Sequence, residues 1–339
     1  MTKILLVAPA WIGDAVLVQP LAARLHERKS NLSLDVLAPP WTEPVFARMP
    51  EVDQTIVAPF GHGELALGKR RALANALKEG RYTQAIVLPN SFKSALVPFF
   101  ARIPIRTGYI GEMRFGLLND IRRLDAHALP RMVDRFAALA EPRGLPPPQP
   151  LPPLRLAVDA KRREATLAKL QLDCKQPVAV LCPGAEYGPA KRWPAPYFAE
   201  LARKLAQDGY HVWLVGSRND AVVGAEITSL SAGACTNLCG STTLAEAIDI
   251  MSCADVVVSN DSGLMHVAAA LDKPLAAIFG SSSPRFTPPL SPRARVVKLD
   301  LPCSPCFKRE CPLGHFDCML KLTPSQVAKA IDSARNATA

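Results

Sequence analysis

The sequence predicts an α/β protein built from two doubly wound parallel sheets that face each other. Three observations support this fold class. Short apolar segments alternate with amphipathic segments, as strands and helices do in parallel sheets covered on both faces. This alternation occurs twice along the chain. The proline-rich stretch Pro142–Pro153 separates the two series and suits neither a helix nor a sheet strand, so it is expected to be a stiff linker.

The first series predicts an N-terminal domain of residues 1–153. The chain begins with a short apolar segment that continues into Asp14 without a break, so we expect a strand there and not a signal peptide. Apolar residues at spacings of three and four predict a helix over Leu65–Lys78. The expected strands are apolar and each ends at a loop: Lys3–Ala8, Leu34–Ala38, Gln54–Ala58, Ala85–Pro89 and Arg106–Tyr109.

The second series predicts a C-terminal domain of residues 154–339 with the same rhythm. An amphipathic helix is expected over Ala195–Gln207. A closing helix is expected after Thr323, because Thr323-Pro-Ser-Gln326 has the pattern of a capping box. The expected strands are Pro177–Cys182, His211–Gly216, Thr236–Cys239, Asp255–Ser259 and Leu275–Phe279.

Composition narrows the class of partner. The chain has 339 residues, of which 49% are hydrophobic and 21% charged, as in well-packed globular proteins. Its formal net charge of +10 indicates an anionic partner. Nucleic acid is disfavoured, because only 6% of residues are aromatic and no basic tract with interleaved aromatics occurs. No apolar stretch reaches the roughly 18 residues of a membrane span. The odd count of nine cysteines favours a reducing compartment, so a cytoplasmic location is expected.

The most informative segment is a strand that runs into Asn260-Asp-Ser-Gly263 and then a helix. Asn260, Asp261 and Ser262 are residue types that cap helices, and the free amides of a helix start bind phosphate. His266 follows within the first turns and can point at the same anion. The alternative is an ordinary strand-to-helix turn with a buried histidine.

A second candidate anion loop lies upstream, at Pro183–Pro194. A strand ends there in a Pro-Gly turn, and Lys191-Arg192 stands just before a helix start. The alternative is a solvated pair of cations. Because both loops follow strands of one sheet, together they predict a crevice for a nucleotide diphosphate.

Other nucleotide-binding classes lack their motifs. The stretch Gly61–Ala66 matches the dinucleotide pattern but does not follow a first strand, and no such turn follows the first strand of either series. A nicotinamide-dependent oxidoreductase is therefore disfavoured. No phosphate loop of the Walker type and no Asp-x-Asp pair occurs, so a metal-bridged diphosphate site is unsupported. A non-catalytic binding protein is the third class that we considered.

With these segments in place, the chain resembles the lipopolysaccharide core heptosyltransferase family, and most closely its type II members. The resemblance rests on segments that span nearly the whole chain in order: Ala10–Asp14, Pro89–Ser94, Arg106–Tyr109, Pro183–Pro194 and Asn260–His266. It implies two facing Rossmann-like domains of the GT-B type. It also implies inverting transfer of L-glycero-D-manno-heptose from ADP-heptose to heptose I of the inner core. Types I and III, or another nucleotide-sugar transferase of this fold, are the alternatives.

The resemblance also implies residue roles. Asp14 would be the catalytic base, although a carboxylate there could simply complement the following helix. Lys191 would stabilise the ADP leaving group, so no cofactor is expected to be required, although Mg²⁺ could stimulate the reaction. The nucleotide sugar would be bound by Gly184, Glu186, Tyr187, Lys191, Thr242, Asp261, Ser262, Gly263 and His266.

The implied acceptor is an anionic lipid A inner core at the cytoplasmic face of the inner membrane, where the enzyme would be peripheral. Cations of the first domain suit its carboxylates and phosphates. Any one of them could instead be a solvated surface charge. The candidates for acceptor binding are Lys93, Arg106 and Arg114, within a wider basic set of His62, Lys69, Arg70, Arg71, Arg122 and Arg123.

Four cysteines occur close together near the C-terminus, at Cys303, Cys306, Cys311 and Cys318, with His315 among them. The first two have the Cys-x-x-Cys spacing of metal sites, but the later spacings fit no common zinc finger or ribbon. We expect free reduced thiols. A structural zinc site and a disulfide are the alternatives.

Overall fold

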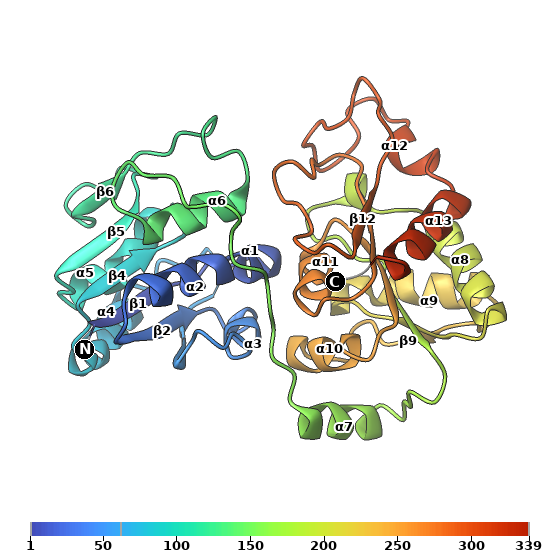
Figure 1. The fold of residues 1–339 in the computed structure, drawn as a ribbon, viewed down its shortest axis with the longest axis horizontal. Coiled ribbons are helices and arrows are strands. Elements are labelled where there is room, and N and C mark those ends of the chain that lie inside the picture. The colour runs from blue at the N-terminus through green and yellow to red at the C-terminus, as the bar shows by residue number, and fades with distance from the viewer. Residues whose placement is uncertain (1, 62, 338–339) are drawn as a thin grey trace. The chain divides into compact units, whose positions relative to one another are not determined.

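The computed structural model describes residues 2–61 and 63–337 and divides the chain into two compact units, residues 1–155 and 156–339 (Figure 1). Each unit contains one parallel six-stranded sheet with helices around it, which confirms the predicted α/β class. The stretch 142–153 contains neither helix nor strand, as expected from its prolines. No helix in the described ranges is long and apolar enough to cross a membrane.

The sheet of unit 1 has the order β3-β2-β1-β4-β5-β6, and every neighbouring pair is parallel. The chain order therefore reverses between β1 and β4, the position at which open α/β sheets bind ligands beyond the carboxyl ends of their strands. Its strands are β1 (Thr2–Val7), β2 (Leu32–Ala38), β3 (Gln54–Val57), β4 (Gln84–Val87), β5 (Ile105–Tyr109) and β6 (Asp120–Arg122).

The helices of unit 1 pack their apolar residues against this sheet. In one part of the core, Leu5 and Val87 of the sheet are packed with Ala74 and Leu77 of α4, and all four are buried. The helices are α1 (Ile12–Leu17), α2 (Gln19–Arg28), α3 (Glu43–Phe46), α4 (Leu67–Leu77), α5 (Leu96–Phe100) and α6 (Met132–Ala137), with 3₁₀ turns η1 (Lys78–Gly80), η2 (Phe92–Ala95) and η3 (Ala138–Ala140).

The sheet of unit 2 repeats this topology, with the order β12-β11-β10-β7-β8-β9, and its switch point lies between β7 and β10. Both central strands are fully buried; β7 is apolar throughout and β10 begins with three valines, as expected of strands covered on both faces. The strands are β7 (Val178–Cys182), β8 (His211–Leu214), β9 (Thr236–Asn237), β10 (Val256–Asn260), β11 (Leu275–Ile278) and β12 (Ala294–Val297).

The core of unit 2 is centred on Trp193, which is 1% exposed. Its ring meets the ring of Phe198 edge-on at 4.9 Å, and its indole N–H donates to the carbonyl of Leu322. The last helix begins after Thr323, whose hydroxyl forms the predicted capping box with Gln326. The helices are α7 (Ala160–Lys169), α8 (Ala195–Gln207), α9 (Ala221–Leu230), α10 (Leu244–Met251), α11 (Gly263–Ala270), α12 (Asp317–Leu320) and α13 (Pro324–Arg335), with 3₁₀ turns η4 (Pro189–Lys191) and η5 (Arg218–Asp220).

All ten predicted strands are present, with ends that differ by one or two residues. Two edge strands, β6 and β12, escaped prediction. The strand β6 has the sequence Asp-Ile-Arg and is only half-buried, and β12 alternates too briefly to stand out. Edge strands lack the continuous apolar run by which a buried parallel strand is recognised.

Candidate functional site

A buried ion pair stands at the carboxyl edge of the unit 2 sheet. The ammonium Nζ of Lys191 lies 2.5 Å from Oδ2 of Asp261, and their side chains are 17% and 5% exposed. The hydroxyl of Ser282 donates to the same carboxylate oxygen. Lys191 follows β7, Asp261 follows β10 and Ser282 follows β11, so the ends of three adjacent parallel strands bring the group together.

The two predicted anion loops are joined by Asn260, which is fully buried. Its side-chain amide donates to the carbonyl of Pro183 at 2.8 Å, and its oxygen accepts the N–H of Trp193 at 3.1 Å. The capping role that we predicted for Asn260 and Asp261 is therefore wrong, because their side chains bind the neighbouring loop. This long-range contact fixes the loop of Lys191 against the start of α11.

The start of α11 keeps its backbone donors free of side-chain caps. Ser262 occupies the N-cap position, but its side chain accepts no bond from the first turn, and its hydroxyl lies 3.2 Å from that of Ser259. Uncapped amides at a helix start, with the positive end of the helix dipole behind them, form a ready site for an anion. Gly263 is the first residue of the helix, where the backbone can be approached closely.

His266 lies in α11 and is 4% exposed. Within the described chain, its Nδ1 atom has no hydrogen-bond partner. Burial lowers the pKa of His266 to about 4, with nearby Asp261 opposing and Lys191 adding to the shift, so the ring is neutral at pH 7. A buried, neutral imidazole with an unsatisfied nitrogen suits a polar group of a ligand.

Two hydroxyl groups near the same sheet edge are also buried without a hydrogen-bond partner among the described residues. They are the side-chain hydroxyls of Thr242 and Ser281. Thr242 is a predicted ligand contact and follows β9. Ser281 was not predicted, although its position just after the strand β11, at the same edge, was a usable signal.

The remaining predicted residues of the Pro183–Pro194 loop differ in environment. Tyr187 donates its hydroxyl to the carbonyl of Phe307 at 2.8 Å. Glu186 is exposed. Gly184 packs against the carboxylate of Asp220, where a Cβ atom would overlap it, so close packing accounts for this glycine. The structure thus brings predicted site residues from the loops after β7 and β10 and from α11 to one edge of the unit 2 sheet.

In unit 1, Asp14 lies in the first turn of α1, directly after β1. It is half-buried. Trp11 precedes the helix and is 47% exposed, while the indole N–H of Trp41 donates to the carbonyl of Ala10 at 2.8 Å. Asp14 therefore stands at the carboxyl end of β1, beside the switch point of its own sheet.

Two of the predicted acceptor contacts donate hydrogen bonds to backbone carbonyls of their own unit. Arg114 is fully buried, and its guanidinium donates to the carbonyls of Pro89 and Tyr109. Desolvation lowers the pKa of Arg114 to about 10. Arg106 donates to the carbonyls of Leu117 and Ile103, each at 2.6 Å. The burial of Arg114 and its bonds to carbonyls explain it as a structural residue, whereas an acceptor contact of the half-buried Arg106 stays a prediction.

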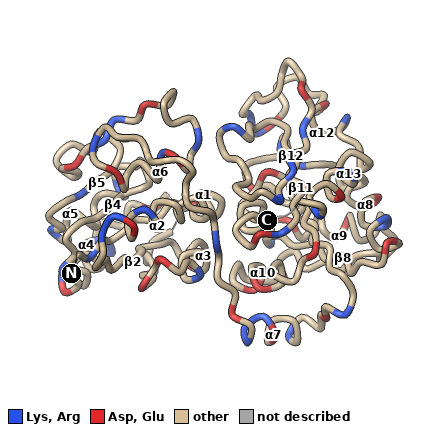
Figure 2. Tube along the Cα trace, viewed as in Figure 1, with Lys and Arg blue, Asp and Glu red and all other residues tan. Residues whose placement is uncertain are grey.

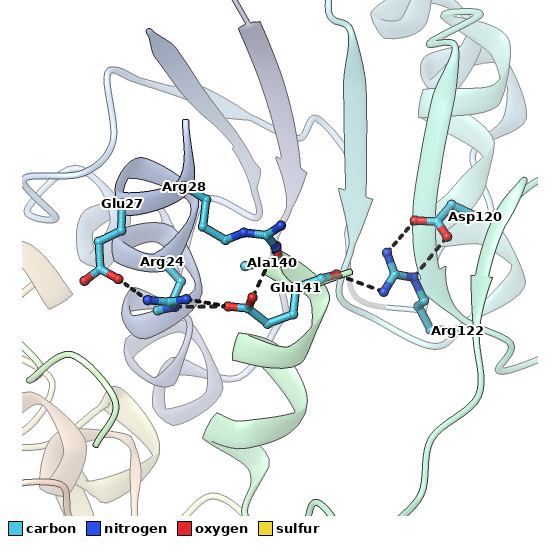
Figure 3. A network of polar contacts seen from close by, with 7 residues as sticks. All are labelled: Arg24, Glu27, Arg28, Asp120, Arg122, Ala140 and Glu141. Carbon is cyan, nitrogen blue, oxygen red and sulfur yellow. Dashed lines mark hydrogen bonds and ion pairs between the residues drawn. The ribbon is translucent and has the colours of Figure 1, made fainter. Parts of the chain in front are cut away.

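Much of the wider basic set is also engaged within unit 1. Arg122 donates to Asp120 and to the carbonyl of Glu141, whose carboxylate pairs with Arg24 and Arg28 of α2 (Figure 3). This network ties α2, β6 and the end of η3 together. Arg70 is 5% exposed and donates to three backbone carbonyls, and Lys69 pairs with Glu64 at 3.2 Å.

The cations left for an anionic acceptor are few. Arg71 and Arg123 are exposed and Lys93 is half-buried, whereas His62 lies outside the described residues. Figure 2 shows basic residues scattered along both units. Residues 1–155 nevertheless hold 20 Lys and Arg against 13 Asp and Glu, a net +7 of the chain's +10. Unit 1 is therefore the more basic of the two.

The nine cysteines carry free thiols. One cavity of about 20 Å³ is lined by the four cysteines of the C-terminal region, Cys303, Cys306, Cys311 and Cys318. The backbone N–H of Phe316 donates to the sulfur of Cys311 at 3.4 Å. This bond, with smaller contributions from neighbouring backbone N–H groups, lowers the pKa of Cys311. Across residues 2–61 and 63–337, no three His, Cys, Asp or Glu side chains are grouped so that they could hold a metal ion.

Comparison with known proteins gives a consistent result. Residues 70–317 match glycosyltransferase family 9 (heptosyltransferase). The lipopolysaccharide heptosyltransferase 2 of Escherichia coli K12 is 46% identical over 340 residues, 98% of each chain. The lipooligosaccharide heptosyltransferase 2 of Haemophilus influenzae Rd is 44% identical over 308 residues, 88% of each chain. The solved structure of E. coli ADP-heptose lps heptosyltransferase II has a TM-score of 0.88 at 44% identity and covers 98% of both chains.

Proposed function

The chain belongs to glycosyltransferase family 9 (heptosyltransferase), and we propose that it adds the second heptose of the lipopolysaccharide inner core. In this reaction L-glycero-D-manno-heptose moves from ADP-heptose to heptose I, with inversion at the anomeric carbon. The relatives from E. coli and H. influenzae are heptosyltransferases 2, which supports this type of transfer. The observation that carries the proposal is the group formed by Lys191, Asp261 and His266 beside the uncapped start of α11.

On the donor side, unit 2 would bind the nucleotide sugar. The amides at the start of α11 would receive a phosphate, and Lys191 would add an ammonium where the departing ADP gathers negative charge. His266 is neutral, so it would contribute a hydrogen bond and not a charge. The free hydroxyl groups of Thr242 and Ser281 would bind polar groups of the nucleotide or the sugar.

On the acceptor side, we assign the base to Asp14 of unit 1. The acceptor hydroxyl forms a bond to the anomeric carbon while the bond from that carbon to the diphosphate oxygen breaks. The hydroxyl proton passes to the carboxylate of Asp14, and ADP leaves with the bonding electrons. Attack opposite to the leaving group inverts the anomeric carbon.

Unit 1 would also bind the anionic acceptor, a lipid A inner core at the membrane face. Its net charge supports this assignment. Of the predicted contacts, Lys93 and Arg106 are half-buried and would serve this role, whereas the guanidinium of Arg114 is fully buried and bound to carbonyls. Arg71 and Arg123 are exposed cations of the same unit that could share the role.

No cofactor is needed in this scheme. Charge on the leaving diphosphate is met by Lys191 and by helix amides, which replace the divalent cation that carboxylate pairs hold in other transferases. A stimulating effect of Mg²⁺ is compatible with it, because a free cation can also bind the released ADP.

A panel of acceptors tests the assignment. The purified protein is incubated with ADP-heptose and with cores that end before heptose I, at heptose I, or at heptose II. We expect a gain of one heptose only on the core that ends at heptose I, and an anomeric configuration opposite to that of the donor. Transfer to the core without heptose I would indicate type I, and transfer to the core with heptose II would indicate type III. Retention of configuration would contradict inversion.

A further inference from the structure

We propose that Arg309 is a second cation of the donor site and binds the diphosphate beside Lys191. The proposal rests on the function proposed above and adds a residue that the sequence did not single out. Arg309 lies between β12 and α12, in residues 298–316, which we call the cysteine-rich segment. This stretch contains neither helix nor strand.

The cysteine-rich segment is attached to the carboxyl edge of the unit 2 sheet. The hydroxyl of Ser304 donates to the carbonyl of Gly280, and the N–H of Phe307 donates to the carbonyl of Ser281, each at 2.7 Å. Both acceptors directly follow β11. The segment is thus fixed to the edge where Asp261 and the start of α11 stand.

A second set of contacts attaches the segment to the loop of Lys191. The carbonyl of Arg309 accepts the N–H of Ala190 at 3.0 Å, and Tyr187 donates to the carbonyl of Phe307. Gly188, with a φ of 154°, lies so near that a Cβ atom on it would be 2.5 Å from the Arg309 carbonyl oxygen. The backbone of Arg309 is therefore held next to the turn that carries Lys191.

The two cations share one aromatic ring. The ammonium of Lys191 lies 5.1 Å from the centre of the Tyr187 ring, and the guanidinium carbon of Arg309 lies 5.4 Å from it. Cations are attracted to an aromatic face within about 6 Å. Tyr187 thus holds both charged groups at one place on the loop.

Lys191 and Arg309 differ in whether a carboxylate balances their positive charge. Asp261 already balances Lys191, and His266 is neutral, so the buried group has no net charge. The diphosphate of a nucleotide sugar is dianionic and gains charge as it leaves. Arg309 is exposed, and among the described residues no carboxylate is paired with it. It supplies the uncompensated positive charge, in a planar fork that matches phosphate oxygens.

Binding of ADP, AMP and adenosine to three variants tests the proposal by calorimetry. Arg309→Ala removes the side chain. Arg309→Gln keeps a stem and a planar amide on Tyr187 but removes the charge. Lys308→Ala removes the neighbouring exposed cation and is the matched control. Thermal unfolding of each variant accompanies the binding data.

We expect Arg309→Ala and Arg309→Gln to weaken ADP binding by roughly tenfold or more, the usual value of a hydrogen bond to a charged group. Affinity for adenosine should not change, the loss for AMP should be smaller than for ADP, and Lys308→Ala should bind ADP like the parent. An ADP affinity of Arg309→Gln equal to that of the parent would overturn the proposal. It would mean that the Arg309 side chain only packs on the Tyr187 ring. Equal losses for ADP and adenosine would overturn it as well. A parent protein that binds no ADP would instead refute the proposed function itself.

Discussion

Lys191 and Asp261 are 70 residues apart in sequence, yet Nζ and Oδ2 lie 2.5 Å apart at the carboxyl edge of one sheet. The pair is almost entirely withdrawn from water, and the same carboxylate also accepts the hydroxyl of Ser282. A buried charge needs such compensation. The pair is neutral as a whole, so the charge of a bound phosphate calls for a further cation at this edge.

Replacing Lys191 with Ala should weaken ADP binding and slow transfer, because Lys191 meets charge that is present in the ground state and grows in the transition state. The expected loss is about 1.5–3 kcal/mol. Titration with ADP and steady-state kinetics measure it. Adding Asp261→Asn should not restore affinity, since the ammonium is still missing. Full rescue by that second change would show that only the stranded carboxylate was harmful.

Replacing Asp14 with Asn should leave ADP binding nearly unchanged but lower the transfer rate by roughly 10²–10⁴, the usual contribution of a general base. Binding by calorimetry and turnover by ADP release separate the two effects. Glu79→Gln, which neutralises an exposed carboxylate of the same unit, is the matched control. Near-normal turnover in Asp14→Asn would refute the assignment of the base.

The pKa of His266 makes stability depend on pH. Burial lowers that pKa from 6.5 to about 4, so the unfolded chain binds the proton more readily than the folded one. The stability that this group contributes is complete above about 6.5 and is lost as the pH falls towards 4, to a limit of roughly 3 kcal/mol. Urea unfolding at pH 7 and pH 4.5 measures the loss.

In His266→Gln this part of the acid destabilisation should disappear. His211→Gln, at a partly exposed position of the same unit, should keep it. An unchanged pH dependence in His266→Gln would mean that the imidazole is not the buried neutral group described above.

Chelation tests the absence of a metal requirement. Transfer should continue in EDTA at a rate similar to that of untreated enzyme, because Lys191 and the amides of α11 can meet the diphosphate charge. Release of ADP from ADP-heptose is followed with EDTA and after Mg²⁺ is added back. Complete loss of transfer that Mg²⁺ restores would contradict the proposed chemistry.

The four cysteines around the small cavity should be reduced thiols without metal. Elemental analysis of protein purified without chelator or affinity metal, together with a thiol titration after unfolding, checks this. Less than stoichiometric zinc or iron and nine reactive thiols are expected. Stoichiometric zinc or iron would establish a structural site there.

The sequence predicted best those strands whose apolar residues show directly that the strand is buried. The segment Val178–Cys182 is a continuous apolar run, and Val256–Asn260 begins with three valines; both are central strands. The grouping of Lys191, Asp261 and His266 was also predictable in outline, because the carboxyl ends of parallel strands must meet at one edge. Short edge strands such as Asp120–Arg122 carry no comparable pattern.

Side-chain partners across the fold were not predictable. The sequence presents Arg114 as one cation among many, and only the packed loops reveal that carbonyls of Pro89 and Tyr109 enclose it. Asn260 has the chemistry of a helix cap, but a carbonyl 77 residues away is its partner. Arg309 lies next to Tyr187 only because the cysteine-rich segment folds back onto the sheet edge.

The most direct test of the central claim is the release of ADP from ADP-heptose in the presence and absence of a core that ends at heptose I. The account predicts rapid ADP release that depends on this acceptor, with one heptose gained by the core for each ADP formed. Equal ADP release without the acceptor, or no release with it, would contradict the assignment of this chain as a heptosyltransferase that extends heptose I.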